Sequence, residues 1–143
     1  MKSTYSFPFA LAQHQGYYLQ NIGTGYTGVP SNTATNILYT SSIPIGVWRV
    51  DFSVKNTITT GGTITASQSY IATSAAPTTP LAFTGALIKS HISENYATGD
   101  IQVITSSFTM NVSTAGTFSL TILRTFSTGA YTFTGEVAVT RIA

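Results

Sequence analysis

The chain of 143 residues has no cysteine, which excludes disulfide bonds, thiol nucleophiles and thiolate metal ligands. Charge is scarce as well. Asp, Glu, Lys and Arg make up 7% of the residues, against about 25% in an ordinary soluble domain. Stability is therefore expected to come from strand pairing and apolar packing, and few ionisable groups are left for chemistry.

Basic clusters and long apolar runs are also missing. The basic residues stand singly along the chain, so none belongs to a run that would neutralise adjacent phosphates. They are Lys2, Arg49, Lys55, Lys89, Arg124 and Arg141. The apolar runs are far shorter than the ~18 residues of a membrane-spanning helix. Neither a nucleic-acid partner nor membrane insertion is expected.

Candidate catalytic groups are few. The histidines and carboxylates are His14, His91, Asp51, Glu94, Asp100 and Glu136. His91 and Glu94 lie three residues apart, which places them on opposite faces of a strand. Glu94 and Asp100 flank one predicted turn, and two carboxylates alone bind a divalent cation weakly. We expect no enzyme activity, no metal site and no cofactor.

What the chain has in abundance is hydroxyl groups: Thr (26) and Ser (16) occupy 42 positions. Thr is β-branched and suits a pleated strand. Residues 47–55 show the clearest alternation, with Trp48, Val50 and Phe52 on one face, and Trp48 is expected to anchor the core. Phe118 and Phe133 are predicted to join it from two later strands.

Further alternating stretches, separated by turn signals every 10–15 residues, extend the pattern. Residues 64–72 are predicted to follow 47–55 through a hairpin at Thr60–Thr63, with Ile64, Ala66 and Tyr70 on one face. A strand is expected over residues 81–92. The apolar face of residues 101–112 changes parity near Val103, which predicts a β-bulge.

The absence of crossover helices favours two packed antiparallel sheets. We therefore predict an all-β fold, a two-sheet antiparallel β-sandwich of seven or eight strands. A jelly roll and an immunoglobulin-like Greek key both satisfy the pattern, although the Cys-Trp-Cys spacing of the immunoglobulin type is absent. The closing strand, residues 131–143, is expected to lie between two neighbours and to complete the module.

The sandwich domain is predicted to span residues 36–143. Residues 1–35 have several glycines and no sustained period, which indicates an N-terminal arm and loop with a short strand around residues 17–19. The arm is rich in aromatics, and Phe7, Phe9, Tyr17 and Tyr18 are its candidate contacts with another surface.

Three segments carry a family resemblance. They are IPIGVWRVDFSV at residues 43–54, AGTFSL at residues 115–120 and YTFTGEVAVTRIA at residues 131–143. They resemble the opening and the last two strands of the globular heads of phage and large-virus fibres. The resemblance implies a jelly roll related to the tumour necrosis factor and complement-type trimers, and a homotrimer that binds a host surface or fits into a virion. The chain has no long repetitive shaft, which favours a small capsid-associated subunit.

The functional hypothesis is therefore a non-enzymatic structural protein located in the virion, with other virion proteins as partners. In a fibre-head variant, two loops recognise a host receptor or glycan; their residues are Thr60, Gly61, Gly62, Thr98, Gly99 and Asp100. The alternative from another class is a free carbohydrate-binding, lectin-like module, whose sequence would show the same pattern of sandwich strands. An enzyme is the third possibility.

Overall fold

The computed structural model describes residues 16–26, 31–90 and 94–143. Within these residues the fold is all-β without a helix, which confirms the predicted two-sheet antiparallel sandwich. The strands are β1 (Tyr18–Tyr26), β2 (Thr35–Tyr39), β3 (Gly46–Thr60), β4 (Gly62–Thr73), β5 (Leu87–Ser90), β6 (Glu94–Tyr96), β7 (Ile101–Val112), β8 (Phe118–Phe126) and β9 (Ala130–Arg141).

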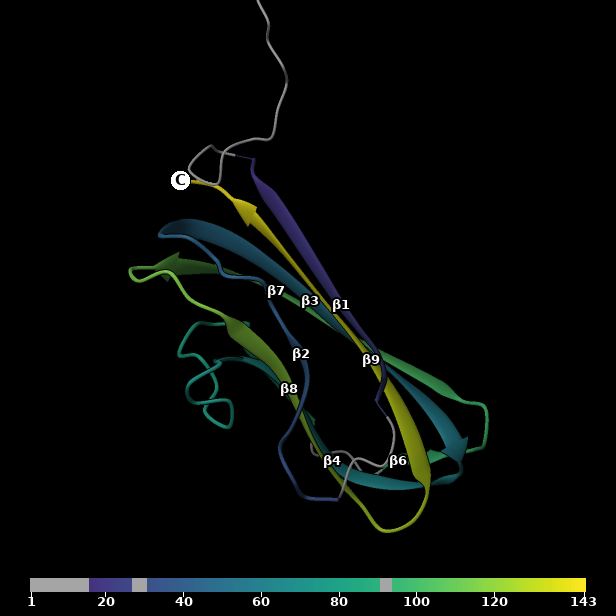
Figure 1. Cartoon of the computed structure of the whole chain (residues 1–143). Coiled ribbons are helices and arrows are strands. Elements are labelled where there is room, and N and C mark those ends of the chain that lie inside the picture. The colour runs from purple at the N-terminus through teal and green to yellow at the C-terminus, as the bar shows by residue number, and fades with distance from the viewer. Residues whose placement is uncertain (1–15, 27–30, 91–93) are drawn as a thin grey trace, which may run out of the picture.

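One sheet has the order β1-β9-β3-β7, and the other has the order β2-β8-β4-β5 with β6 also on β4 (Figure 1). The pairings are nested: β1 pairs with β9, β2 with β8, β3 with β7 and β4 with β6, all antiparallel. A long antiparallel ribbon rolled up in this way is a jelly roll. As expected, β9 lies between two neighbours, β1 and β3.

The connection from β3 to β4 is not the predicted hairpin. β3 pairs with β7 and β9, whereas β4 pairs with β5, β6 and β8 in the opposite sheet. The chain therefore arches from one sheet to the other at Gly61. Glycines suit a hairpin and an arch equally. Both β3 and β4 have an apolar face to bury, and placing them in facing sheets buries the two apolar faces against each other.

The expected anchors lie in the core between the sheets. Trp48 and Phe133 are fully buried, and Val50, Phe52 and Phe118 are at most 8% exposed. The indole Nε1 of Trp48 donates a hydrogen bond to the carbonyl oxygen of Pro44 at 2.9 Å, so its polar atom is satisfied inside the core.

The predicted bulge near Val103 is wrong. β7 pairs with β3 in unbroken register from Thr57 opposite Ile101 to Gly46 opposite Val112. Alternation therefore places Ile101 and Val103 on the outer face, where they are 56% and 59% exposed. Pairing with β3 fixes the register of the whole strand, and two apolar side chains at odd positions do not overturn it.

A shift in register occurs instead in β4, between Ile64 and Ala66 against β8. It separates residues that were predicted to share a face: Ile64 belongs to the core cluster, whereas Tyr70 lies on the other face of the sheet. Tyr70 is nevertheless 2% exposed and its hydroxyl donates to the carbonyl oxygen of Thr78 at 3.3 Å, because the loop after β4 covers it.

Two strand boundaries also differ from the prediction. β1 spans nine residues and pairs with β9, so residues 18–26 belong to the sandwich and not to an arm. Gly23 and Gly25 hide this strand from periodicity analysis because they carry no side chain. The strand expected over residues 81–92 is described as far as residue 90, and of residues 81–90 only 87–90 form the strand β5; Gly85, with φ +93°, belongs to the preceding loop.

Alkaline pH is predicted to loosen the loop that covers Tyr70. Burial raises the pKa of the Tyr70 hydroxyl above its ordinary value of 10.0. The neutral tyrosine therefore contributes stability below pH ~10, and this contribution is lost as the pH rises through the raised folded-state pKa. Tyr70→Phe is expected to lessen the fall in unfolding free energy above pH ~10. Urea titrations of the native protein and of Tyr70→Phe at pH 8 and pH 11 measure the free energy of unfolding. An equal alkaline loss of this free energy in the two proteins would contradict the prediction.

No helix of the described residues is long and apolar enough to cross a membrane.

Candidate functional site

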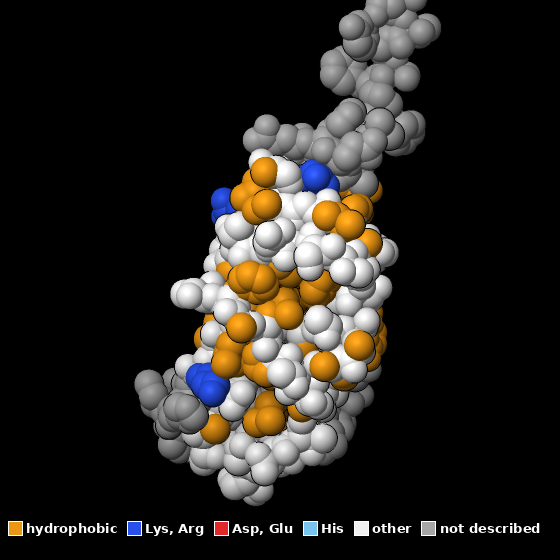
Figure 2. All heavy atoms as spheres, turned by 90° about the vertical axis from the view of Figure 1, so that its left-hand side faces the viewer, with side chains coloured by type: hydrophobic (Ala, Val, Ile, Leu, Met, Phe, Trp, Pro, Cys, Tyr) orange, Lys and Arg blue, Asp and Glu red, His pale blue; other side chains and the backbone are white. Residues whose placement is uncertain are grey.

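The outer faces of the two sheets differ in how far the chain itself covers them. On the β2-β8-β4-β5 sheet, the loop between β4 and β5 lies over Tyr70 and Thr121, and Thr121 Oγ1 donates to the carbonyl oxygen of Pro77 at 3.0 Å. Figure 2 shows this side of the molecule, with hydrophobic side chains gathered across its middle, Lys and Arg near its margins and no acidic side chain in view. The loop between β4 and β5 thus covers part of the outer face of this sheet.

The outer face of the β1-β9-β3-β7 sheet is covered with hydroxyl groups and carries a balanced set of charges. Arg49, Asp51 and Lys55 alternate along β3, and Glu136 lies on β9. Arg49 forms a salt bridge to Asp51 at 3.1 Å, and Ser107 Oγ on β7 donates to the same carboxylate at 2.5 Å. Two cations and two anions make this face locally neutral.

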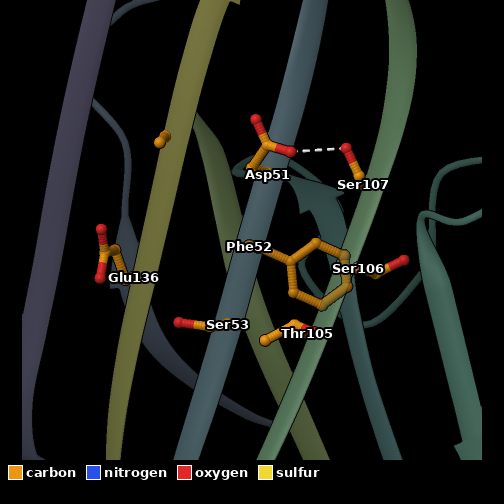
Figure 3. A pocket seen from close by; sticks show the side chains of 8 residues that line it. Asp51, Phe52, Ser53, Thr105, Ser106, Ser107 and Glu136 are labelled. Atoms are coloured by element: carbon orange, nitrogen blue, oxygen red, sulfur yellow. Dashed lines mark hydrogen bonds between the residues drawn. The ribbon is translucent and has the colours of Figure 1, made fainter.

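A shallow hollow of about 410 Å³ lies at the centre of this face. Its side-chain floor is formed by small residues, and carboxylates stand at its two sides. The outward-facing residues of its lining are Asp51, Ser53, Thr105, Ser107, Glu136 and Ala138. Figure 3 shows Asp51 and Ser53 on β3, with Thr105 and Ser107 of β7 on one side and Glu136 of β9 on the other.

Hydroxyl and carboxylate groups at such a hollow can exchange hydrogen bonds with a hydroxyl-rich ligand. Both carboxylates already have partners, however, because Gln20 Nε2 donates to Glu136 at 2.5 Å and Ser107 donates to Asp51. Phe52, the aromatic residue of the lining, is 2% exposed and belongs to the core. Within the described residues, no three metal-ligating side chains gather into a cluster.

The large apolar side chains that the strands of this sheet expose on its outer face lie at its two margins. Tyr18 and Ile22 on β1 are 53% and 58% exposed, and Ile101 and Val103 stand on β7. The sequence alone does not reveal this pair of margins, because it depends on β1 and β7 being the two edges of one sheet. These exposed apolar margins lie on either side of the central strands β9 and β3, whose outward-facing charges balance.

β1 and β7 are edge strands with little of the usual protection: neither carries charge or proline, and only β1 has an irregularity, a register shift between Gly23 and Tyr26. β7 is 12 residues long, contains neither a charged residue nor proline, and pairs with β3 without a bulge. β1 is nine residues long and also lacks charge and proline. Edge strands normally carry such devices because their unpaired N–H and C=O groups recruit other strands. The two edges are therefore suited to contact with another chain.

The two predicted ligand loops come together at one end of the sandwich. The backbone N–H of Gly61 donates to Thr98 Oγ1 at 3.1 Å, and the N–H of Gly99 donates to the carbonyl oxygen of Ile58 at 2.8 Å. Asp100 Oδ2 accepts from the N–H of Ala97 at 2.7 Å. These polar groups hold the loops to each other and to β3. Thr60 is exposed and Gly62 is half-buried beside them, and a ligand role for this end stays a prediction.

The structure places only part of the predicted aromatic arm. Tyr17 packs edge-on against Trp48, with ring centroids 6.1 Å apart, and Tyr18 begins β1 and is exposed. Phe7 and Phe9 lie outside the described residues. His14 and His91 do so as well, so the placement of His91 and Glu94 on opposite faces of a strand stays a prediction.

No family model matches the sequence, and no curated protein matches it. Solved structures match the fold. The VP2 protein of infectious bursal disease virus in derived T=1 particles aligns with TM-score 0.55 and 12% identity, covering 99% of this chain and 36% of that chain. A crystallised VP2 subviral particle of the same virus aligns with TM-score 0.54 and 12% identity, covering 90% and 34%. This chain therefore spans about a third of the length of those capsid chains.

The Eiger TNF of S. frugiperda aligns with TM-score 0.53 and 9% identity, covering 91% of this chain and 94% of that chain. At these identities the likeness is one of fold. It supports the jelly-roll kind found in virus capsid and TNF-like proteins, and it does not single out the fibre-head family.

Proposed function

We propose that the chain is a non-enzymatic structural subunit of a virion, and that it assembles with copies of itself through the β1-β9-β3-β7 sheet. The observation that carries the proposal is the pair of long, uncharged edge strands, each bearing exposed apolar side chains, on either side of a charge-balanced face. The likeness in fold to a capsid protein that forms particles supports this kind of role.

The scarcity of charged residues also favours self-association. With 7% charged residues, the surface has few like-charge repulsions to keep copies apart. Closed symmetric assembly is the common way for a protein to cover exposed apolar surface and sheet edges.

A trimeric ring fits the positions of the two edges. β1 and β7 are different strands at opposite margins of one sheet, so contact between β7 of one copy and β1 of the next is heterologous. Heterologous contacts close into rings when the rotation between copies permits. Among such rings we propose the homotrimer that the resemblance to tumour necrosis factor-type trimers implies, with the aromatic N-terminal segment around Phe7 and Phe9 as the attachment to other virion proteins.

Val103→Lys tests the assembly. A lysine on the outer face of the β7 edge is expected to raise the dissociation constant of the oligomer at least tenfold, because it places charge where apolar contact is needed. Light scattering coupled to gel filtration at micromolar concentration measures the mass. Thr79→Lys adds the same charge to an exposed loop position over the other sheet and should leave the mass unchanged. A native protein that is monomeric at tens of micromolar would refute the proposal.

The carbohydrate-binding alternative has one favourable observation, the hydroxyl- and carboxylate-lined hollow around Ser53. A glycan array on the native protein and on Ser53→Tyr, which fills the hollow, separates the two functions. Sugar binding by a monomer that Ser53→Tyr abolishes would support the lectin. Assembly without sugar binding supports the virion subunit, and a host receptor role would show as binding by the oligomer alone.

A further inference from the structure

A buried arginine lies between the two sheets, and neither the fold nor the proposed assembly uses it. Arg124 on β8 is fully buried. Its guanidinium stands over the ring of Phe133, 5.6 Å from the centroid. Nη1 donates to the carbonyl oxygens of Gln68 and Leu123, and Nη2 donates to Ser69 Oγ at 3.0 Å. These hydrogen-bond partners are all neutral, and Nε has none.

The positive charge is retained in this setting. Burial lowers the pKa of Arg124 to about 10, which leaves the guanidinium protonated at neutral pH. No carboxylate of the described residues contacts it, and the salt bridge between Arg49 and Asp51 lies at the surface. A buried charge without a counter-charge is costly, and proteins normally pair it.

Three more polar side chains with unpaired atoms lie in the same layer of the sandwich. Ser67 is the direct partner of Arg124 across β4 and β8. In the facing sheet, Asn56 is the partner of Phe133 across β3 and β9, and Gln102 is the partner of Asn56 across β3 and β7. Since Arg124 stacks on Phe133, the two rows face each other.

The unpaired atoms include donors and acceptors: Arg124 Nε and Asn56 Nδ2 donate, Ser67 Oγ can donate, and Asn56 Oδ1 and Gln102 Oε1 accept. Ser67 Oγ, both Asn56 side-chain atoms, Gln102 Oε1 and Arg124 Nε are buried without a hydrogen-bond partner. Gln102 Nε2 lies 3.0 Å from the Tyr96 hydroxyl. The two ends of a side-chain amide exchange by a half-turn, so Gln102 can present its NH₂ to the layer while its oxygen faces Tyr96. Arg124, Asn56, Ser67 and Gln102 then offer N–H and O–H groups around one positive charge.

We infer that this layer binds one small monovalent inorganic anion, chloride in ordinary buffers, held by Arg124 Nε, Asn56 Nδ2 and Ser67 Oγ. One positive charge calls for one negative charge, and the enclosed position between the sheets excludes a large anion. Bound water would satisfy the orphaned groups but would leave the charge of Arg124 uncompensated. The site is independent of the proposed assembly, since it lies inside a single chain.

Bromide provides a direct test. Crystals grown or soaked in sodium bromide should show an anomalous peak at Arg124 Nε of the native protein, with Asn56 Nδ2 and Ser67 Oγ in contact. A peak that is absent, or a site that holds only water, overturns the inference. This measurement needs no variant and does not depend on whether an altered protein folds.

A solution test uses the native protein and two variants. At constant ionic strength, replacing gluconate by chloride should raise the unfolding midpoint of the native protein by a few degrees and then saturate, as expected for a ligand of the folded state. Arg124→Met should lose this chloride dependence. Arg49→Met, which removes an exposed arginine of the same charge, should keep it. Equal chloride dependence in the two variants would contradict the site.

Discussion

Trp48→Ala is expected to lower the free energy of unfolding by about 3–5 kcal/mol, the range for truncating a large buried aromatic. Trp48 is fully buried. Its ring meets Tyr17 edge-on, the Arg141 guanidinium lies 5.6 Å from its centroid, and its Nε1 donates to the Pro44 carbonyl. The indole thus ties together the segment before β1, the start of β3 and the end of β9. Its removal leaves a cavity and an unpaired carbonyl group.

Urea unfolding followed by circular dichroism measures the effect. Ile45→Ala is the matched control, because Ile45 lies three residues earlier in the chain and is 60% exposed. Its truncation is expected to change stability by no more than about 0.5 kcal/mol. Similar losses in the two variants would mean that Trp48 does not anchor the core, and the inward orientation of the even-numbered side chains of β3 would then be wrong.

The local part of the fold was predictable from the sequence. Alternation in residues 47–55 places Trp48, Val50 and Phe52 on one side, and a period of two needs no knowledge of the partner strand. The same rule contained a signal that we did not use. Phe118, Leu120 and Ile122 alternate along β8, and Arg124 continues that series inward.

The choice of partner strands was not predictable in the same way. Two glycines at residues 61–62 suit a hairpin as well as an arch, and only pairing far along the chain decides between them. The same holds for Val103, whose apolar side chain suggested an inward position until the unbroken register with β3 placed it outside. The candidate assembly face depends on β1 and β7 becoming the two edges of one sheet, and pairing with β9 and β3 determines this.

Gly62→Ala is expected to cost about 3 kcal/mol, at the upper end of the usual range for overpacking. A Cβ at Gly62 would lie 2.0 Å from the carbonyl oxygen of Thr128 and 2.6 Å from its carbonyl carbon. Both atoms belong to backbone, so a side-chain rotation cannot relieve the clash. The Thr128 carbonyl also accepts a hydrogen bond from the Tyr131 hydroxyl at 3.0 Å, which restrains the turn between β8 and β9.

Gly116→Ala is the matched control for Gly62→Ala. The nearest atom to a Cβ at Gly116 is the Thr114 carbonyl oxygen at 3.9 Å, and its backbone needs no positive φ. This substitution should be neutral or add up to about 1 kcal/mol, through the reduced entropy of the unfolded chain. If Gly62 instead serves a ligand contact without a packing role, Gly62→Ala would unfold at the same urea concentration as Gly116→Ala. A large loss in Gly62→Ala alone would assign Gly62 to the packing of the arch against the β8–β9 turn.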